Sequence, residues 1–182
     1  MKKVLIPIAQ GFEDLEAVTV IDLLRRANID VTVAGLDDGF ITGSRGTRIL
    51  PDDNLTNVVD DDYDMVVLPG GQPGADNLNK DSRVIQLLAT MSSKGDYVAA
   101  ICAAPKVLAT AGLLENRQMT AYPGVLSDAT VAGMKNTGDA VVVDGKIITS
   151  RGPGTALEFS LQLIQLLVGE GVRNQIEEGL QG

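Results

Sequence analysis

Hydrophobic residues fall along this chain in two alternating patterns. Short, continuous apolar runs are typical of parallel strands that are covered on both faces of a sheet. Longer segments carry an apolar stripe of helical period, as Val20, Leu23, Leu24 and Ala27 do, and predict amphipathic helices. The two patterns predict strands over 4–9, 30–36, 65–68 and 97–101, and helices over 13–27, 81–93, 156–168 and 170–180. Asp81 is expected to cap the second of these helices at its N-terminus.

Two further segments predict β-hairpins. In the segment 40–52, apolar residues flank the turn-forming stretch 43–46. Later in the chain, the apolar runs 140–143 and 146–150 are joined by Asp144 and Gly145, a pair that favours a tight hairpin turn.

Strands that alternate with helices at this spacing predict an α/β fold, a doubly wound and mostly parallel sheet with helices on both faces. The length suits one domain, taken as residues 1–182. Ligands of such sheets bind at the carboxyl ends of the strands. Gly70, Gly71, Cys102 and the loop 151–155 all follow predicted strands, so we expect them to meet at that edge.

The only cysteine lies where the 97–101 run ends and a helix begins. Because proline is tolerated in the first turn of a helix, Pro105 supports a strand, a sharp turn at Cys102, and then a helix. This layout resembles a nucleophile elbow, where free N–H groups and a helix dipole stabilise a thiolate. The local pattern leaves a buried, inert cysteine open, but the convergence of three stretches on one edge favours a reactive thiol.

Composition narrows the chemistry. With 15 basic against 24 acidic residues, a net charge of −9 and no basic patch, the chain is not expected to bind nucleic acid. Histidine is absent, which removes Ser-His-Asp and Cys-His mechanisms and the usual metal ligands. One cysteine allows neither an intrachain disulfide nor a cysteine-based zinc site. Catalysis must therefore rest on the thiol, carboxylates, hydroxyls, backbone dipoles or Lys and Arg, with no metal.

No apolar run reaches the length of a membrane span. The run that follows Lys2 and Lys3 is too short for a signal peptide, and acidic residues come directly after it. A cytoplasmic protein without a membrane partner is therefore expected. The aspartates between 52 and 64 do not match the spacing of a calcium loop, so this stretch predicts a solvated surface.

Two glutamates begin the predicted helix 13–27. Glu16 lies in phase with the apolar stripe, and Glu13 does so less closely. A carboxylate that faces inward is costly unless it is paired or protonated. The alternative is an acid placed at the helix N-terminus for its dipole, and periodicity does not decide between the two.

Five stretches carry a more specific pattern, namely 11–16, 44–45, 68–71, 99–105 and 149–155. Together they resemble the ThiJ/PfpI superfamily, in the branch of the Parkinson-disease-associated deglycase and its bacterial relatives. The resemblance runs in order from residue 3 to residue 175. It implies a flavodoxin-like sandwich that forms a homodimer, with the first helix in the interface.

The resemblance also implies roles for single residues. Cys102 would be the nucleophilic, oxidisable thiol, and Glu16 the family's buried glutamate, which decides between the two glutamates. The backbone amides of Gly71 and Ala103 would form an oxyanion pocket, with Gly70 beside them. A Glu16 kept protonated by burial could donate a hydrogen bond to the thiolate, so the sequence predicts a Cys102 pKa well below the free value of ~8.5.

Three positions are implied less directly. Arg45, from the partner subunit, and Asp22 would lie at the mouth of the site. Some members of the family carry a histidine before the proline that Pro123 matches, but here the residue is Tyr122. Since tyrosine donates a hydrogen bond but is a poor base near neutrality, Tyr122 argues against a Cys-His peptidase and leaves Glu16 to move protons.

The function implied is a glyoxalase or deglycase that needs no cofactor, and its substrate is a small dicarbonyl such as methylglyoxal or an early glycation adduct. Cys102 would add to the aldehyde and Glu16 would transfer protons. One alternative is a redox sensor or stress chaperone that uses an oxidisable Cys102. A weaker alternative is an intracellular peptidase or amidase.

Overall fold

The computed structural model of the chain describes residues 1–181. Seven strands form one sheet in the order β10-β11-β7-β6-β1-β2-β5. Its strands are β1 (Lys3–Ile8), β2 (Asp30–Gly35), β5 (Asp53–Asn54), β6 (Met65–Leu68), β7 (Tyr97–Ile101), β10 (Val141–Asp144) and β11 (Ile147–Ser150). The helices are α1 (Asp14–Arg26), α2 (Leu55–Val58), α3 (Gln72–Lys80), α4 (Ser82–Lys94), α5 (Pro105–Thr110), α6 (Ala156–Val168) and α7 (Glu170–Gly179).

The sheet is parallel except at one edge, where β10 and β11 pair antiparallel as the predicted hairpin. Asp144 pairs with Ile147, so the two-residue turn is Gly145 and Lys146, one position later than the sequence suggested. The remaining strands are two residues long: β3 (Ile41–Thr42) and β4 (Arg48–Ile49) make the second predicted hairpin, and β8 (Gln118–Met119) pairs with β9 (Lys135–Asn136). This arrangement is the flavodoxin-like fold that was expected.

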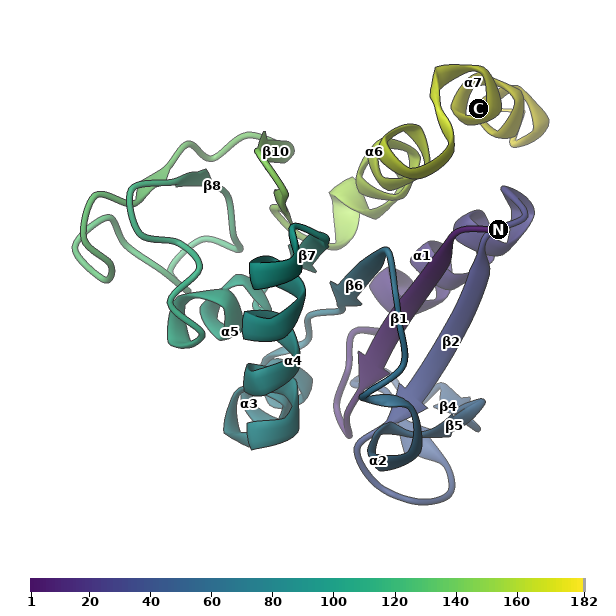
Figure 1. Cartoon of the computed structure of the whole chain (residues 1–182), viewed down its shortest axis with the longest axis horizontal. Helices are drawn as coiled ribbons and strands as arrows, with labels where there is room; N and C mark the ends of the chain where they lie inside the picture. The colour runs from purple at the N-terminus through teal and green to yellow at the C-terminus, as the bar shows by residue number, and fades with distance from the viewer. Residues whose placement is uncertain (182) are drawn as a thin grey trace.

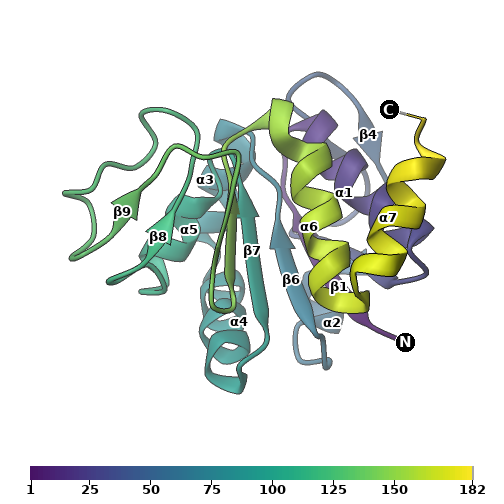
Figure 2. The same ribbon diagram turned by 90° about the horizontal axis from the view of Figure 1, so that it is seen from above.

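Helices cover both faces of the sheet (Figures 1 and 2). On one face α1 packs against α6, and α7 packs on the outside of α6; on the other face α3, α4 and α5 contact one another. The excursion that holds β8 and β9 lies beyond the β10–β11 edge (Figure 2). None of the helices among residues 1–181 is both long and apolar enough to cross a membrane.

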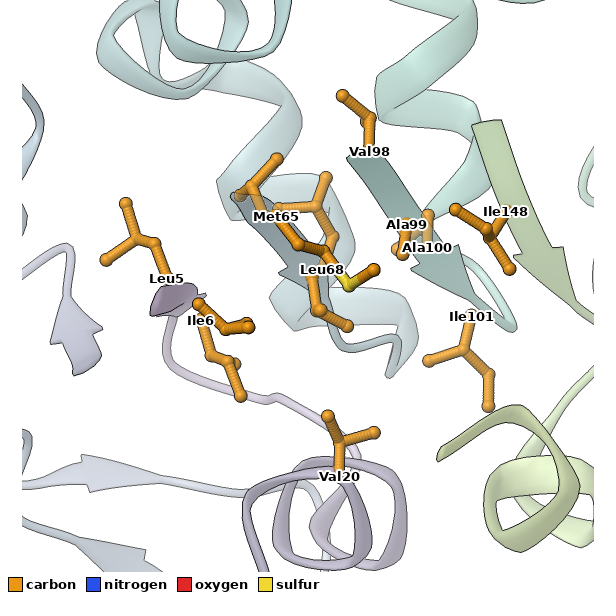
Figure 3. Packing of buried hydrophobic residues seen from close by; sticks show 14 of the residues in the cluster. Leu5, Ile6, Val20, Met65, Leu68, Val98, Ala99, Ala100, Ile101 and Ile148 are labelled. Carbon is orange, nitrogen blue, oxygen red and sulfur yellow. The ribbon is translucent and has the colours of Figure 1, made fainter. Parts of the chain in front are cut away.

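The continuous apolar runs become the core because both faces of the strands are covered. Every residue of β6 is fully buried, as are Val98, Ala99, Ala100 and Ile101 of β7. Figure 3 shows side chains of β1, β6, β7 and β11 together, with Val20 of α1 directed at the sheet.

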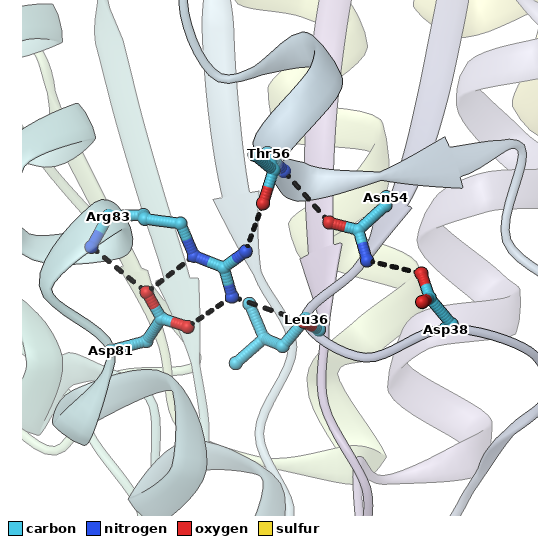
Figure 4. Close-up of polar contacts among 6 residues, drawn as sticks. All are labelled: Leu36, Asp38, Asn54, Thr56, Asp81 and Arg83. Atoms are coloured by element: carbon cyan, nitrogen blue, oxygen red, sulfur yellow. Dashed lines mark hydrogen bonds and ion pairs between the residues drawn. The ribbon is translucent and has the colours of Figure 1, made fainter.

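An arginine network ties α4 to the end of β2 (Figure 4). The Arg83 guanidinium donates to Asp81 at 2.6 Å, to Thr56 at 2.6 Å and to the carbonyl of Leu36 at 3.1 Å. Asp81 caps α4 by accepting from the Arg83 N–H, as the sequence predicted. The network is half-buried, so it orders these loops at the carboxyl end of the sheet more than a surface pair would.

Two elements contradict the sequence analysis. The acidic stretch 52–64 is not simply a solvated surface, since it contains β5, which pairs with β2, and α2, whose Leu55 is fully buried. The segment 72–80 was not predicted as a helix, but it forms α3. Its glycine, proline and asparagines have low helix propensity, and packing against α4 and α5 supplies the stabilisation that local sequence does not.

The β3–β4 hairpin is fastened to the start of α1 by Asp14, a residue that the sequence analysis did not single out. Its carboxylate accepts from the N–H groups of Arg45 at 2.8 Å and Thr47 at 2.7 Å. A Cβ at Gly43 would lie 2.5 Å from the Asp14 carboxylate, so only glycine permits this approach. Burial raises the pKa of Asp14, but the hydrogen bonds from Thr47 and Arg45 outweigh it and lower the pKa below 3.8.

We expect Asp14→Ala to lower the free energy of unfolding by about 2–3 kcal/mol, because two charge-assisted hydrogen bonds are lost. A lowered pKa means that Asp14 contributes fully above its unfolded value of 3.8, and that the contribution disappears as the pH falls through the folded pKa. Urea unfolding near pH 7 and below about pH 4 measures both effects. The exposed Glu115, as Glu115→Ala, is the control and should change stability by less than ~0.5 kcal/mol; equal losses in the two variants would contradict the assignment.

Candidate active site

Cys102 lies on a sharp turn between β7 and α5. Its φ is 63°, a left-handed conformation that costs a non-glycine residue about 1–2 kcal/mol and that recurs at functional sites. The turn is held on both sides, because the Cys102 N–H donates to the carbonyl of Ser150 at 2.9 Å and its carbonyl accepts from the N–H of Tyr122 at 2.8 Å. The residue is 8% exposed, so the strand, turn and helix are confirmed and the thiol lies just beneath the surface.

Glu16 of α1 is buried beside this turn and is fully inaccessible to solvent. Its Oε2 accepts a hydrogen bond of 2.8 Å from the N–H of Gly70, whereas its Oε1 has no hydrogen-bond partner among the described residues. A Cβ at Gly70 would lie 2.6 Å from Glu16 Oε2 and 2.7 Å from the Cβ of Cys102. The absence of a side chain at Gly70 is therefore what lets carboxyl and thiol share one enclosed space.

The backbone N–H groups of Gly71 and Ala103 lower the pKa of the Cys102 thiol, because they favour negative charge on the sulfur. Gly71 has φ 84°, and a Cβ there would lie 2.5 Å from the carbonyl oxygen of Gly11, so the loop needs glycine. N–H groups in this position can stabilise negative charge on sulfur or on an oxygen bonded next to it. An oxyanion pocket formed by these two residues, as the family resemblance implied, stays a prediction.

An ion pair that the sequence analysis missed joins the two helices that start beside the sulfur. Lys106 on α5 bonds to Asp76 on α3, and this bond is the first cause that lowers the Asp76 pKa. The pair holds α3, which follows Gly71, against α5, which follows Ala103. Because its members lie thirty positions apart, no local pattern would have paired them.

Glu16 and Cys102 titrate as a pair. Burial raises the pKa of Glu16 to about 7, because the apolar surroundings disfavour the ionised carboxylate. Burial first, and then the negative charge of an ionised Glu16, raise the pKa of Cys102 to about 12, while the N–H groups of Gly71 and Ala103 lower it. The pair therefore releases its first proton near neutral pH, and the negative charge left behind strongly opposes release of the second.

The low thiol pKa expected from sequence is wrong for the state in which Glu16 is ionised. A thiolate at neutral pH requires the shared proton to lie on Glu16, where like-charge repulsion vanishes and the carboxylic acid can donate a hydrogen bond. The unpartnered Oε1 is the atom available for that proton. For the state in which Glu16 is protonated, a low pKa of the Cys102 thiol stays a prediction.

The remaining predicted site residues lie farther out. Tyr122 is bonded to Cys102 through its backbone, but its ring is half-exposed. Arg45 is exposed at the tip of the β3–β4 hairpin, and its side chain has no hydrogen bond or ion pair within residues 1–181. Asp22 forms an exposed ion pair of 2.8 Å with Arg26. A single chain therefore brings Cys102 and Glu16 together, but it does not place Arg45 or Asp22 beside them.

Within the described residues no group of three or more His, Cys, Asp or Glu side chains could hold a metal ion. The site is thus built from one thiol, one carboxyl group and backbone N–H donors, a set that suits nucleophilic chemistry at a carbonyl carbon.

The family model described as DJ-1/PfpI matches residues 2–166. The chain belongs to the DJ-1/PfpI family. Protein dj-1beta of Drosophila melanogaster is 43% identical over 181 residues, which cover 98% of this chain and 96% of that protein. The glutathione-independent glyoxalase DJR-1.2 of Caenorhabditis elegans is 35% identical over 164 residues, covering 90% of this chain and 87% of that one.

Solved structures of DJ-1 proteins share the fold closely. The crystal structure of Drosophila melanogaster DJ-1beta superposes with a TM-score of 0.92 at 41% identity and covers 99% of this chain and 97% of its own. The structure of oxidised DJ-1 of Toxoplasma gondii also gives a TM-score of 0.92, at 36% identity, with 100% and 98% covered. The resemblance found in the sequence and the flavodoxin-like fold expected from it are both confirmed.

We expect alkylation of Cys102 by iodoacetamide to accelerate as the pH rises through about 7, because the pair then loses its first proton, and to level off above that pH. In Glu16→Gln no neighbouring carboxyl titrates, so the step near pH 7 should disappear. Alkylation rates measured by intact mass from roughly pH 5 to pH 9 test this. The same step in wild type and Glu16→Gln would show that Glu16 does not share its proton with the thiol.

Proposed function

We propose that this member of the DJ-1/PfpI family is a cysteine-dependent glyoxalase that needs neither glutathione nor another cofactor and converts methylglyoxal or glyoxal to hydroxy acids. The observation that carries the proposal is the close packing of the Cys102 turn and the buried Glu16 carboxyl group on either side of Gly70. The N–H groups of Gly71 and Ala103, which favour negative charge on the sulfur, support it. The glyoxalase named among its relatives supports the same chemistry.

In the first step the Cys102 thiolate would add to the aldehyde carbon of methylglyoxal and form a C–S bond. The carbonyl electron pair moves to oxygen, which is stabilised by the two N–H groups and takes the proton from Glu16. The product is a hemithioacetal. Glu16 is now a carboxylate, and its raised pKa makes it a base poised near neutral pH.

In the second step Glu16 would remove the hydrogen from the former aldehyde carbon, and the resulting enediol would be protonated at the neighbouring carbon. This isomerisation turns the hemithioacetal into a thioester without any oxidant, since one carbon is oxidised as its neighbour is reduced. Water then releases lactate and restores the thiol, so that methylglyoxal plus water gives lactate.

The same steps on a hemithioacetal or aminocarbinol of a glycated Cys, Lys or Arg would release the unmodified side chain, which is deglycase activity. Here the adduct first dissociates to the free dicarbonyl, or Cys102 attacks its carbinol carbon and displaces the thiol or amine of the glycated side chain. The later steps are unchanged. We therefore include early glycation adducts among the substrates of the proposed enzyme.

We expect purified protein to form lactate from methylglyoxal without glutathione. Cys102→Ser should lose the activity by a factor of about 10³ or more, since the nucleophile is gone. Glu16→Gln should lose about 10²-fold or more, because proton transfer at carbon fails. Lactate is measured enzymatically against a buffer control. Turnover that survives in Cys102→Ser would contradict the mechanism.

A second candidate is redox sensing by Cys102, favoured by the unpartnered Glu16 Oε1, which could donate to a sulfinate oxygen when protonated. Absence of lactate in the assay above, together with an intact mass increased by two oxygen atoms at Cys102 after mild peroxide, would favour this candidate. A stress chaperone would in addition suppress aggregation of a client only after oxidation. The peptidase alternative lacks the histidine that a Cys-His pair needs.

We also propose that the protein is a homodimer with α1 in the interface. Leu15 and Val18 of α1 are 52% and 46% exposed, so this helix presents large apolar side chains that a partner could cover. Arg45 could then reach the partner's site. We expect light scattering to give twice the chain mass of 19.1 kDa, and Val18→Asp to shift it toward the monomer; a monomeric wild type would overturn the proposal.

A further inference from the structure

A hollow of about 340 Å³ lies next to the turn that carries Cys102. Its walls come from two loops, residues 122–123 and residues 151–155. Both loops are bonded to the cysteine turn, because Tyr122 donates to the Cys102 carbonyl and Ser150, which precedes Arg151, accepts from the Cys102 N–H. The hollow is therefore fixed in place relative to the reactive sulfur.

Arg151 is the only charged residue among those that line this hollow. It is also the only charged residue that lines the adjoining hollow of about 490 Å³, which shares Pro123 and Arg151 with the first. One guanidinium nitrogen donates to the carbonyl of Gly138 at 2.9 Å, and no carboxylate within residues 1–181 pairs with it. The Arg151 guanidinium therefore keeps its charge available to an anion bound in either hollow.

The size of the space points beyond a three-carbon substrate. Pockets of ~300–1,000 Å³ hold drug-sized ligands, so methylglyoxal bound at Cys102 leaves the neighbouring hollow empty. Its walls offer the half-exposed Tyr122 ring, which lies against Gly152, and the guanidinium of Arg151. An aromatic ring beside the paired N–H donors of a guanidinium group suits a short aliphatic chain that ends in a carboxylate.

We propose that Arg151, with Tyr122, forms a subsite for the carboxylate of an acidic dicarbonyl, so that the preferred substrates are 2-oxoaldehydes that carry a terminal carboxylate. The inference rests on the proposed glyoxalase function and names its substrate class. The 2-oxoaldehyde group reacts at Cys102 as methylglyoxal does, and the carboxylate pairs with Arg151 without taking part in bond changes. With 4,5-dioxopentanoate and water as reactants, the product is 2-hydroxyglutarate.

The test compares kcat/KM for 4,5-dioxopentanoate with kcat/KM for 2-oxohexanal, which has similar length and no charge. We expect Arg151→Met to lower this ratio about tenfold or more, since a charge-assisted bidentate contact is lost, and Arg151→Lys to recover part of it. The control Arg173→Gln removes a positive charge from α7, where Arg173 pairs with Glu177, and should keep the ratio. A ratio unchanged in Arg151→Met would overturn the subsite while leaving the glyoxalase proposal intact.

If the protein turns over no dicarbonyl, a binding measurement still tests the Arg151 subsite separately from the proposed glyoxalase activity. We expect 4-oxopentanoate, which has the carboxylate but no aldehyde, to slow alkylation of Cys102 by iodoacetamide, and uncharged 2-pentanone not to do so at equal concentration. The protection should require about tenfold more 4-oxopentanoate in Arg151→Met than in wild type. Protection with this dependence would support the subsite even without turnover; no protection, or equal protection in both proteins, would overturn it.

Discussion

The arrangement of the site depends on one close approach, the packing of the Gly70 Cα between the Glu16 carboxyl group and the Cys102 Cβ. A methyl group at this position would lie 2.6 Å from one and 2.7 Å from the other, closer than packed atoms allow. Since β6 and β7 are neighbouring parallel strands, their carboxyl ends would separate if Gly70 were larger. The glycine therefore brings a residue of α1 into the same enclosed space as a thiol on β7.

That enclosure determines the chemistry, because neither acid can ionise without affecting the other. Excluding water makes the first negative charge costly and the second far more so. In a chain without histidine, the proposed mechanism assigns proton transfer to this carboxyl group, because burial raises its pKa to about 7, where a base works at neutral pH. In that mechanism one shared proton, rather than two independently tuned groups, would supply both the nucleophile and the base.

The sequence predicted the features that arise from short-range patterns. Buried parallel strands are continuous apolar runs, Pro105 starts a helix directly after Cys102, and Asp81 caps α4. The inward phase of Glu16 was visible, although only the family resemblance decided it against Glu13. The remainder depends on contacts between distant parts of the chain. The helix α3 forms against its packing partners, Asp14 bonds a hairpin residue 31 positions away, and the thiol pKa depends on a carboxyl group from α1.

The residues proposed to react and the residues proposed to select the substrate lie on different kinds of element, because the two tasks make different demands. The reacting groups need fixed positions, so they lie on strand ends and helix starts whose sequence signals are strong. Substrate selection can be carried by loops, whose residues are held by backbone hydrogen bonds and leave the side chains free to vary. Tyr122 and Arg151 fit this division: their backbones are bonded to Cys102 and Ala140, while the Tyr122 ring and the Arg151 guanidinium line a hollow next to the thiol. What distinguishes Arg151 is its place as the only charged residue of that hollow, where its guanidinium has no ion pair among the described residues and can meet the charge of a bound molecule.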